Sequence, residues 1–206
     1  MFYSQSGEDK ILYEKYLNYR DGFFIELGAM DGIRYSNTLF FESKLNWTGV
    51  LIEPTYQFER LINNRPACHN FNYAITKNEG FVNFVGNDAV GGVVDTMPEL
   101  HRTGNHIGNN IYQVKSIPIS DLLKDLNIQR VDLFSIDVEG GELQVLETFD
   151  WNIPVYIVLI EQSKYVPEKD EICRVFLRER GFELDTSLVI NSGCEEVWVN
   201  KNNKRN

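Results

Sequence analysis

Few cysteines and no long apolar run exclude several classes of protein. The 206 residues include only three cysteines, which are far apart, and no two of them have C-x-x-C spacing. Neither a disulfide framework nor a zinc knuckle is therefore predicted, and a reducing compartment is expected. No apolar run approaches the roughly 20 residues of a membrane helix. The first ten residues are too polar for the apolar core of a signal peptide. We therefore expect a cytoplasmic protein without a membrane span.

Basic side chains are also scarce. The chain carries 20 Lys and Arg against 30 Asp and Glu, a net charge of −10. Nucleic-acid binding depends on clusters of Lys and Arg, so no nucleic-acid partner is expected. The basic residues of segment 201–206 are interpreted as a solvated terminus. Apolar residues make up 43 % and charged residues 24 %, as in an ordinary globular protein. The length predicts one domain, 1–206.

The apolar pattern predicts an α/β fold. Short β-rich runs alternate with helical patterns, which is typical of βαβ units and a mostly parallel sheet. The final short runs predict an antiparallel C-terminal hairpin that closes the sheet. In the first helix, Ser6 and Asp9 are expected to cap the start. Strands are expected at 23–27, 49–52, 70–74, 80–85, 131–138, 155–160, 182–184, 188–190 and 196–200, and helices at 6–19, 37–45, 56–63, 119–126, 142–149 and 170–180.

The segment 86–113 has no helical or strand periodicity. It is rich in Gly and Asn and holds two of the three histidines. Loops of this length are often lids or binding loops, so an acceptor-side loop is expected, with a disordered excursion as the alternative. His101 and His106 are candidates to reach an acceptor hydroxyl. His69 stands alone and is interpreted as structural, because none of the three histidines has metal-ligand spacing with a Cys or Asp.

The first predicted strand ends in a turn that is suited to a ligand. Segment 26–32 reads ELGAMDG, and Gly28 and Gly32 allow a tight turn and close approach of the backbone. Met30 replaces the middle glycine of the dinucleotide pattern G-x-G-x-x-G, so a pyrophosphate is a less natural ligand than a small charged amino-acid group. A tight turn without a ligand is the structural alternative.

Polar residues around this turn are candidate contacts for an amino-acid group. Glu26 and Asp31 can face its ammonium. The free N–H groups at the start of the next helix, near Ser36 and Asn37, can receive its carboxylate.

The second predicted strand ends in Glu53, which lies 25 positions after Gly28 and just before Pro54. An acidic residue roughly 20 positions beyond a glycine turn is where a ribose diol is bound. A carboxylate can accept both hydroxyl protons. The spacing favours this role over that of an exposed Glu at a strand end.

Three carboxylates follow two later strands. Asp137 and Glu139 end the strand at 131–138, and Glu161 ends the strand at 155–160. If these strands are neighbours, the acids meet at the edge where open parallel sheets bind ligands. Such acids can act as general bases or hold a divalent cation. Glu142, and to a lesser degree Glu139, also fit a simple role at the N-terminus of the next helix, and an ion pair with Lys164 is the alternative for Glu161.

Taken together, these motifs resemble the FkbM family of methyltransferases. The pieces that carry the resemblance are YSQSGEDK at 3–10, FIELGAMDG at 24–32, SNT at 36–38, IEP at 52–54, NYAI at 72–75 and IDVEG at 136–140. The resemblance runs from Tyr3 to about Tyr165. It implies a Rossmann-like class I methyltransferase fold, S-adenosylmethionine as the methyl donor, and O-methylation of a sugar or a glycosylated product.

The resemblance also implies roles for individual positions. The ribose is assigned to Glu53, the adenine pocket to Asn72 through Ala74, and the neighbourhood of the sulfonium to Asp137. Gln5 and Ser6, in an N-terminal segment 1–20, would close the cofactor site. The methionine part is assigned to Glu26, Gly28, Asp31 and Asn37.

Two mechanisms remain open at this stage. A general base, with Asp137, Glu139 and Glu161 as candidates in that order, can take the proton of the acceptor hydroxyl. Alternatively, Mg²⁺ or another divalent ion at Asp137 and Glu161 can lower the hydroxyl pKa.

The alternative functions are a nicotinamide-dependent sugar oxidoreductase or epimerase, a non-catalytic binding module, and an N- or carboxyl-methyltransferase. Met30 and the lack of a Tyr-x-x-x-Lys pair argue against the first. Intact Glu53, Asp137 and Glu139 argue against the second. The acceptor is expected to be a small molecule or a glycan. One further hypothesis is that the chain is a domain of a larger glycan-modifying protein.

Overall fold

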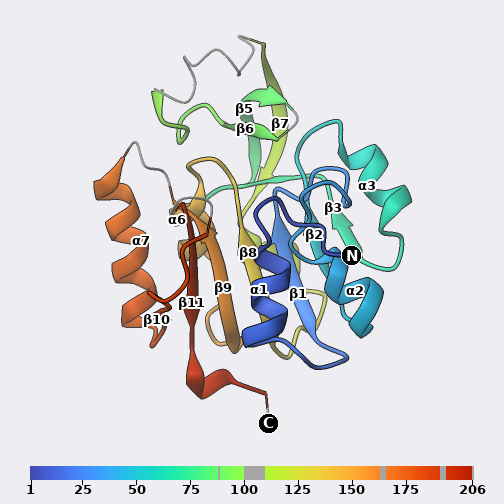
Figure 1. Cartoon of the computed structure of the whole chain (residues 1–206). Helices are drawn as coiled ribbons and strands as arrows, with labels where there is room; N and C mark the ends of the chain where they lie inside the picture. Colours follow the sequence, from blue (N-terminus) through green and yellow to red (C-terminus); the bar gives the residue numbers. More distant parts are fainter. Residues whose placement is uncertain (88, 100–109, 163–165, 191–193, 206) are drawn as a thin grey trace.

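A seven-stranded sheet forms the centre of the molecule. The computed structural model describes residues 1–87, 89–99, 110–162, 166–190 and 194–205. The strand order is β10-β11-β9-β8-β1-β2-β3 (Figure 1). All neighbouring pairs are parallel except β10 with β11 and β11 with β9. The mostly parallel sheet with an antiparallel C-terminal hairpin is thereby confirmed. The strands are β1 (Phe23–Leu27), β2 (Thr48–Ile52), β3 (His69–Phe71), β8 (Val131–Ile136), β9 (Val155–Glu161), β10 (Glu183–Leu184) and β11 (Glu195–Val199).

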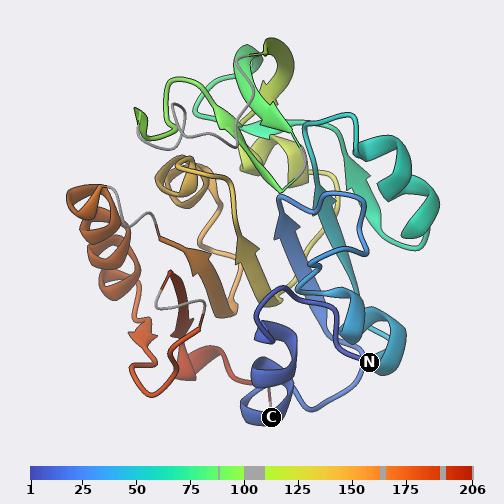
Figure 2. The same ribbon diagram turned by 45° about the horizontal axis from the view of Figure 1, so that its top comes forward.

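Helices cover both faces of this sheet. Because side chains alternate along a strand, Phe24 and Leu51 pack with the core beneath α1 (Glu8–Lys15), α2 (Leu39–Leu45) and α3 (Phe58–Asn64). Their neighbours Ile25 and Val50 pack with the opposite core, beneath α5 (Ile119–Leu123), α6 (Glu142–Thr148) and α7 (Pro167–Glu179). Figure 2 shows the resulting three layers. A short 3-10 helix, η2 (Lys201–Asn203), follows β11. None of the described helices has the length and apolar character needed to cross a membrane.

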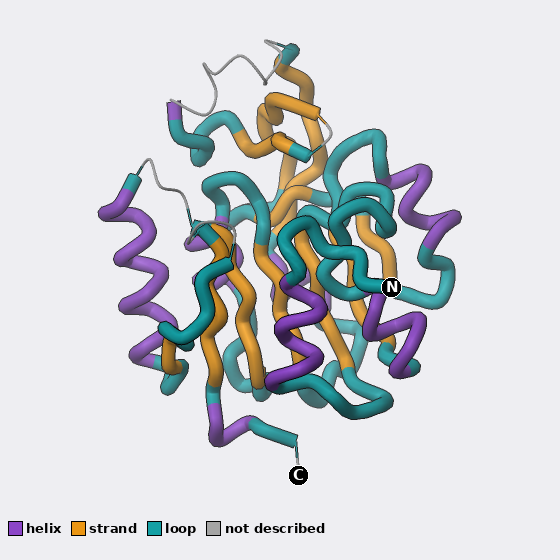
Figure 3. The backbone as a smooth tube through the Cα atoms, in the orientation of Figure 1, coloured by secondary structure: helices purple, strands orange, loops and turns teal. Residues whose placement is uncertain are grey.

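A second sheet is inserted between β3 and β8. Its order is β4-β7-β5-β6, with β4 (Ala74–Ile75), β5 (Gly80–Asn87), β6 (Val90–Val93) and β7 (Ile111–Ile117). Figure 3 shows its strands above the main sheet. The expectation of a loop throughout 86–113 is wrong at both ends, because β6 and the start of β7 pair there with β5. The single strand expected at 70–74 is also wrong, since the chain leaves the main sheet after Phe71 and joins the second sheet at Ala74.

Several element boundaries also differ from expectation. The first helix begins after Gly7, which makes no side-chain cap. Ser4, rather than Ser6, supplies the acceptor oxygen for the Asp9 N–H, at 3.1 Å. The helix α7 begins at Pro167, where the missing proline N–H costs nothing. The strand expected at 188–190 is reduced to a single bridge between Ile190 and Glu195.

Candidate active site

The turn after β1 is wedged between the ends of β2 and β8. Gly28 has a φ of 74°. A Cβ there would lie 2.2 Å from the carbonyl oxygen of Asp137, so no other residue fits without a backbone shift. On the other side, the N–H of Gly28 donates to the carbonyl of Ile52 at 3.1 Å. The N–H of Met30 donates to Glu53 Oε2 at 2.9 Å. Three strand ends are thus held together around one glycine.

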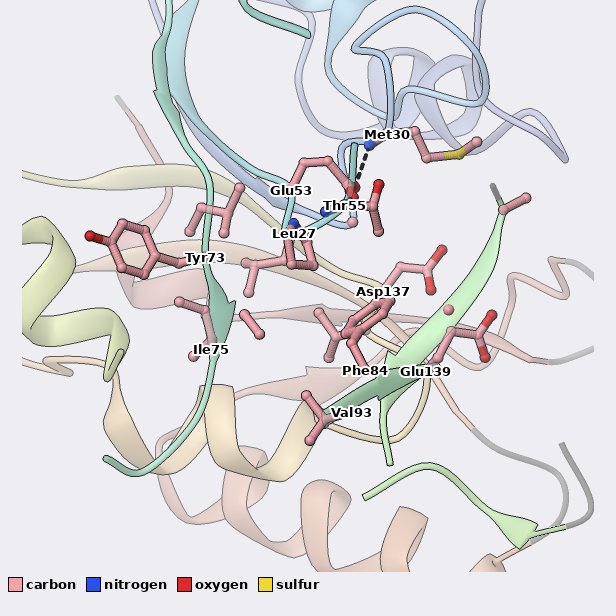
Figure 4. A pocket seen from close by; sticks show the side chains of 18 residues that line it. Leu27, Met30, Glu53, Thr55, Tyr73, Ile75, Phe84, Val93, Asp137 and Glu139 are labelled. Atoms are coloured by element: carbon pink, nitrogen blue, oxygen red, sulfur yellow. Dashed lines mark hydrogen bonds between the residues drawn. The ribbon is translucent and has the colours of Figure 1, made fainter. Parts of the chain in front are cut away.

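A cavity opens beside this turn (Figure 4). A smaller cavity adjoins it, and both are lined by Gly28 and Asp137. Among the residues singled out from the sequence, the larger cavity is lined by Gly28, Glu53, Pro54, Ala74, Asp137 and Glu139. The smaller one is lined by Gln5, Glu26, Gly28, Asn37 and Asp137. Two groups of expected contacts therefore lie on the two sides of the same turn.

Glu53 is buried but keeps acceptor capacity toward the larger cavity. Its Oε1 accepts the Thr55 N–H at 2.8 Å and its Oε2 accepts the Met30 N–H at 2.9 Å. Burial raises the pKa of Glu53 above its ordinary value, and a hydrogen bond from the Thr55 hydroxyl together with these two N–H groups opposes the shift. A carboxylate offers about four lone-pair positions, so about one remains on Glu53 for a ligand hydroxyl.

Glu26 anchors the loop that follows the turn. Its carboxylate accepts the Asn37 N–H at 2.7 Å, the Ser36 hydroxyl at 3.0 Å and the Thr38 hydroxyl at 2.5 Å. Burial raises the pKa of Glu26, and the nearby Arg65 guanidinium opposes the shift. Asn37 also donates from Nδ2 to Ser135 Oγ at 3.0 Å. Glu26 is therefore mostly satisfied by the protein, which leaves about one lone pair for a ligand.

Five of the expected cofactor contacts line neither cavity: Ser6, Asp31, Gly32, Ser36 and Asn72. Their contacts support the surrounding backbone instead. Asp31 Oδ1 accepts the N–H groups of the two residues after Gly32 at 2.9 and 2.8 Å. Ser36 Oγ accepts the Leu39 N–H at the start of α2, at 3.1 Å. Asn72 Nδ2 donates to the Glu53 carbonyl at 2.8 Å.

Asp137, Glu139 and Glu161 come together at the ends of β8 and β9. One carboxylate oxygen from each lies within 4.8 Å of the others. Burial and then the charges of Glu161 and Glu139 raise the pKa of Asp137 well above its ordinary value. Burial and then Glu161 raise the pKa of Glu139 to about 8. The cluster can therefore hold shared protons near neutral pH, and its oxygens are of the type that divalent cations bind.

Two further carboxyl groups, which the sequence did not single out, belong to this region. Glu195 on β11 lies opposite Glu161 on β9. Burial and the charge of Glu161 raise the pKa of Glu195 to about 8. Glu8 lines the smaller cavity together with Glu195. Only the pairing of β11 with β9 brings Glu195 here, so no local motif could have revealed it. By contrast, Glu142 accepts the Gly140 N–H at 2.9 Å, in the structural role at the helix start that was kept open for it.

The histidines add nothing to the described site. His69 is exposed on β3. His101 and His106 lie outside the described residues, as does Lys164. A role for the two loop histidines stays a prediction.

Comparison with known proteins identifies the family. A model described as "Methyltransferase FkbM domain" matches residues 26–184. A search of curated proteins found no match. Among solved structures, M. capricolum TrmK, described in complex with S-adenosyl-homocysteine, is 8 % identical with a TM-score of 0.49; the match covers 99 % of this chain and 72 % of that one.

Two other structures are similar at the same level. Precorrin-6y C5,15-methyltransferase from Geobacter metallireducens GS-15 is 10 % identical with a TM-score of 0.47, covering 93 % of this chain and 85 % of that one. A SAM dependent methyltransferase from Aquifex aeolicus is 10 % identical with a TM-score of 0.47, covering 94 % and 89 %. The family model spans more than half of the sequence, and the sheet order is that of a Rossmann-like class I methyltransferase. The chain belongs to the FkbM methyltransferase domain family.

Proposed function

We propose that this protein transfers the methyl group of S-adenosylmethionine to a hydroxyl of a sugar or glycan. The observation that carries the proposal is the meeting of Glu53, the Gly28 turn and Asp137 at two adjoining cavities. Family membership supports methyl transfer as the reaction. The donor supplies a methyl group on a positively charged sulfur, and the rest of the reaction depends on how the chain positions the two substrates.

The two cavities suit the two halves of the donor. Glu53 keeps about one acceptor position for a ribose hydroxyl, and Ala74 belongs to an apolar wall suited to the adenine base. On the other side of Gly28, Gln5 and Asn37 line the smaller cavity, where the methionine part would lie. Asp137 lines both cavities and would therefore lie close to the sulfonium.

The acid cluster is suited to deprotonating the acceptor. A sugar hydroxyl is a weak nucleophile, so a base that accepts its proton assists the attack on the methyl group. Asp137 is the first candidate, with Glu139 and Glu161 next to it. In the proposed step the hydroxyl proton passes to a carboxylate, the oxygen–methyl bond forms, and the sulfur–methyl bond breaks. The bonding electrons return to sulfur and neutralise its charge.

A divalent cation at Asp137 and Glu161 is the second candidate for activating the acceptor. The proximity of their oxygens, and of Glu139, favours it. An ion there would lower the pKa of a bound hydroxyl. Because the ion would activate the hydroxyl, methyl transfer would then depend on added Mg²⁺ and would be lost on treatment with a chelator. The ion would also compete with protons for these carboxylates.

The class of acceptor is tested by methyl transfer to a panel of compounds. The purified chain would be incubated with donor carrying a labelled methyl group and with neutral sugars, amines or carboxylates. We expect label in an alkali-stable ether of a sugar, at least 100-fold less with Asp137→Ala, and no change with the exposed control Asp121→Asn. Label in an amine or an ester would replace the proposed acceptor with a nitrogen or a carboxyl group. Full activity of the Asp137 variant would remove this residue from the mechanism.

A further inference from the structure

Phe84 comes from the second sheet but lines the larger cavity of the site. It lies on β5 and is only 4 % exposed. Its cross-strand partner Val93 on β6 lines the same cavity. In Figure 4 both side chains lie on the side of the cavity formed by the second sheet. The main sheet thus supplies one wall of the cavity, and the inserted sheet supplies another.

We propose that Phe84 stacks on the adenine ring of the methyl donor and makes the second sheet a part of the cofactor site. The inference rests on the proposed donor. The main sheet contributes apolar Ile52, at the end of β2, and Val138, after β8, to this cavity, and Ala74 and Ile75 on β4 of the second sheet also line it. With the ribose at Glu53, the apolar part of the cavity is the space that remains for the base. A flat aromatic ring on one side and aliphatic groups on the other form a slot for a purine.

The neighbourhood of Phe84 keeps its ring in place. The ring centroid of Tyr112 on β7 lies 5.7 Å from that of Phe84, at a tilt of 49°. A Cβ at Gly91 would lie 2.9 Å from Phe84 Cε1, so glycine at this position makes room for the ring. A Cβ at the next residue, Gly92, would lie 2.9 Å from the carbonyl oxygen of Glu139. The strand β6 therefore packs directly against the loop that carries Glu139, which fixes the second sheet over the site.

The test compares two ligands in binding titrations. S-adenosylhomocysteine carries the whole donor skeleton, whereas 5′-methylthioadenosine keeps the base and ribose but lacks the amino acid. We expect Phe84→Ala to weaken both ligands by the same factor, about 5- to 150-fold. Phe84→Leu keeps most of the volume but loses the flat ring, and should weaken both by about 2- to 12-fold. The matched control is Phe81→Ala on the same strand, where the side chain is 66 % exposed; its affinities should equal those of the wild type.

The outcomes separate this inference from the proposed function. If the wild type binds neither ligand, the proposed donor is wrong. If the wild type binds both and Phe84→Leu, verified as folded by denaturation, binds them equally well or more tightly, the stacking role is wrong. A loss confined to S-adenosylhomocysteine also overturns it, because the effect would then come from the amino-acid side of the site.

Discussion

Arg65 is the residue that follows α3, and its buried side chain hydrogen-bonds to the loop after the glycine turn. Its side chain is fully buried and ion-paired with Glu42. The guanidinium also donates to the Gly32 carbonyl at 2.9 Å, to Ser36 Oγ at 3.2 Å and to Thr38 Oγ1 at 3.2 Å. Arg65→Met keeps much of the side-chain volume but leaves these four partners without their donor. We expect the variant to be less stable and to bind the donor more weakly.

The magnitude follows from the burial of the charge. Removing one partner of a buried ion pair costs about 3–5 kcal/mol. For a chain of this size, 1 kcal/mol corresponds to about 2–4 °C in Tm, so Tm should fall by about 6–20 °C. Denaturation in urea would measure the free energy of unfolding. The matched control is Arg60→Met on α3, where the arginine is exposed and the change should stay within about 0.5 kcal/mol. A loss for Arg65→Met no larger than that of the control would refute this reasoning.

Three other variants test the site. Gly28→Ala should abolish binding of S-adenosylhomocysteine, because its Cβ would lie 2.2 Å from the Asp137 carbonyl; retained affinity would contradict the close fit of the turn. Burial raises the pKa of Glu139 from 4.5 to about 8, so between these pH values the folded protein keeps a proton that the unfolded chain has lost, and stability falls as pH rises. Glu139→Gln lacks this titrating carboxyl group and should be more stable than the wild type at pH 9 by about 1–3 kcal/mol, measured by denaturation at pH 5 and pH 9. If the free energies of unfolding of the variant and the wild type changed equally between these pH values, the raised pKa of Glu139 would be contradicted. Lys169 donates to the Gly140 carbonyl, so Lys169→Met should cost about 1–3 kcal/mol in the same assay, and an unchanged midpoint would show that this bond contributes nothing.

The main sheet could be predicted from the sequence because its strands are buried on both faces. Apolar runs such as 23–25 and 155–160 need no knowledge of their partners to be recognised. Of the second sheet, the strand expected at 80–85 is confirmed as β5, but β6 could not be predicted, because it contains Gly91 and Gly92 and has little intrinsic strand propensity. The strand β6 forms because β5 supplies its hydrogen bonds and the Glu139 loop supplies a surface to pack against.

The site likewise contains residues that local sequence reveals and residues that only distant strand pairing brings together. Glu53 and Asp137 could be placed from strand ends and spacing, since parallel strands deliver their ends to one edge, whereas Ala74 was assigned only by the family resemblance. Ser36 and Asp31 were expected to meet a ligand, but in the structure both accept hydrogen bonds from backbone N–H groups of the segment that follows the turn. Polar residues near a turn have the same sequence signature in either role. Phe84 and Glu195 arrive through strand pairings distant in sequence, so no local pattern marks them.

The most direct test of the account is isothermal titration of the purified chain with S-adenosylhomocysteine, with and without Mg²⁺, and with NAD in parallel. The account predicts micromolar binding of S-adenosylhomocysteine and none of NAD. A change in affinity with Mg²⁺ would favour the cation at Asp137 and Glu161 over the metal-free base. Binding of NAD without binding of S-adenosylhomocysteine would contradict the methyl-donor assignment and favour a nicotinamide-dependent enzyme.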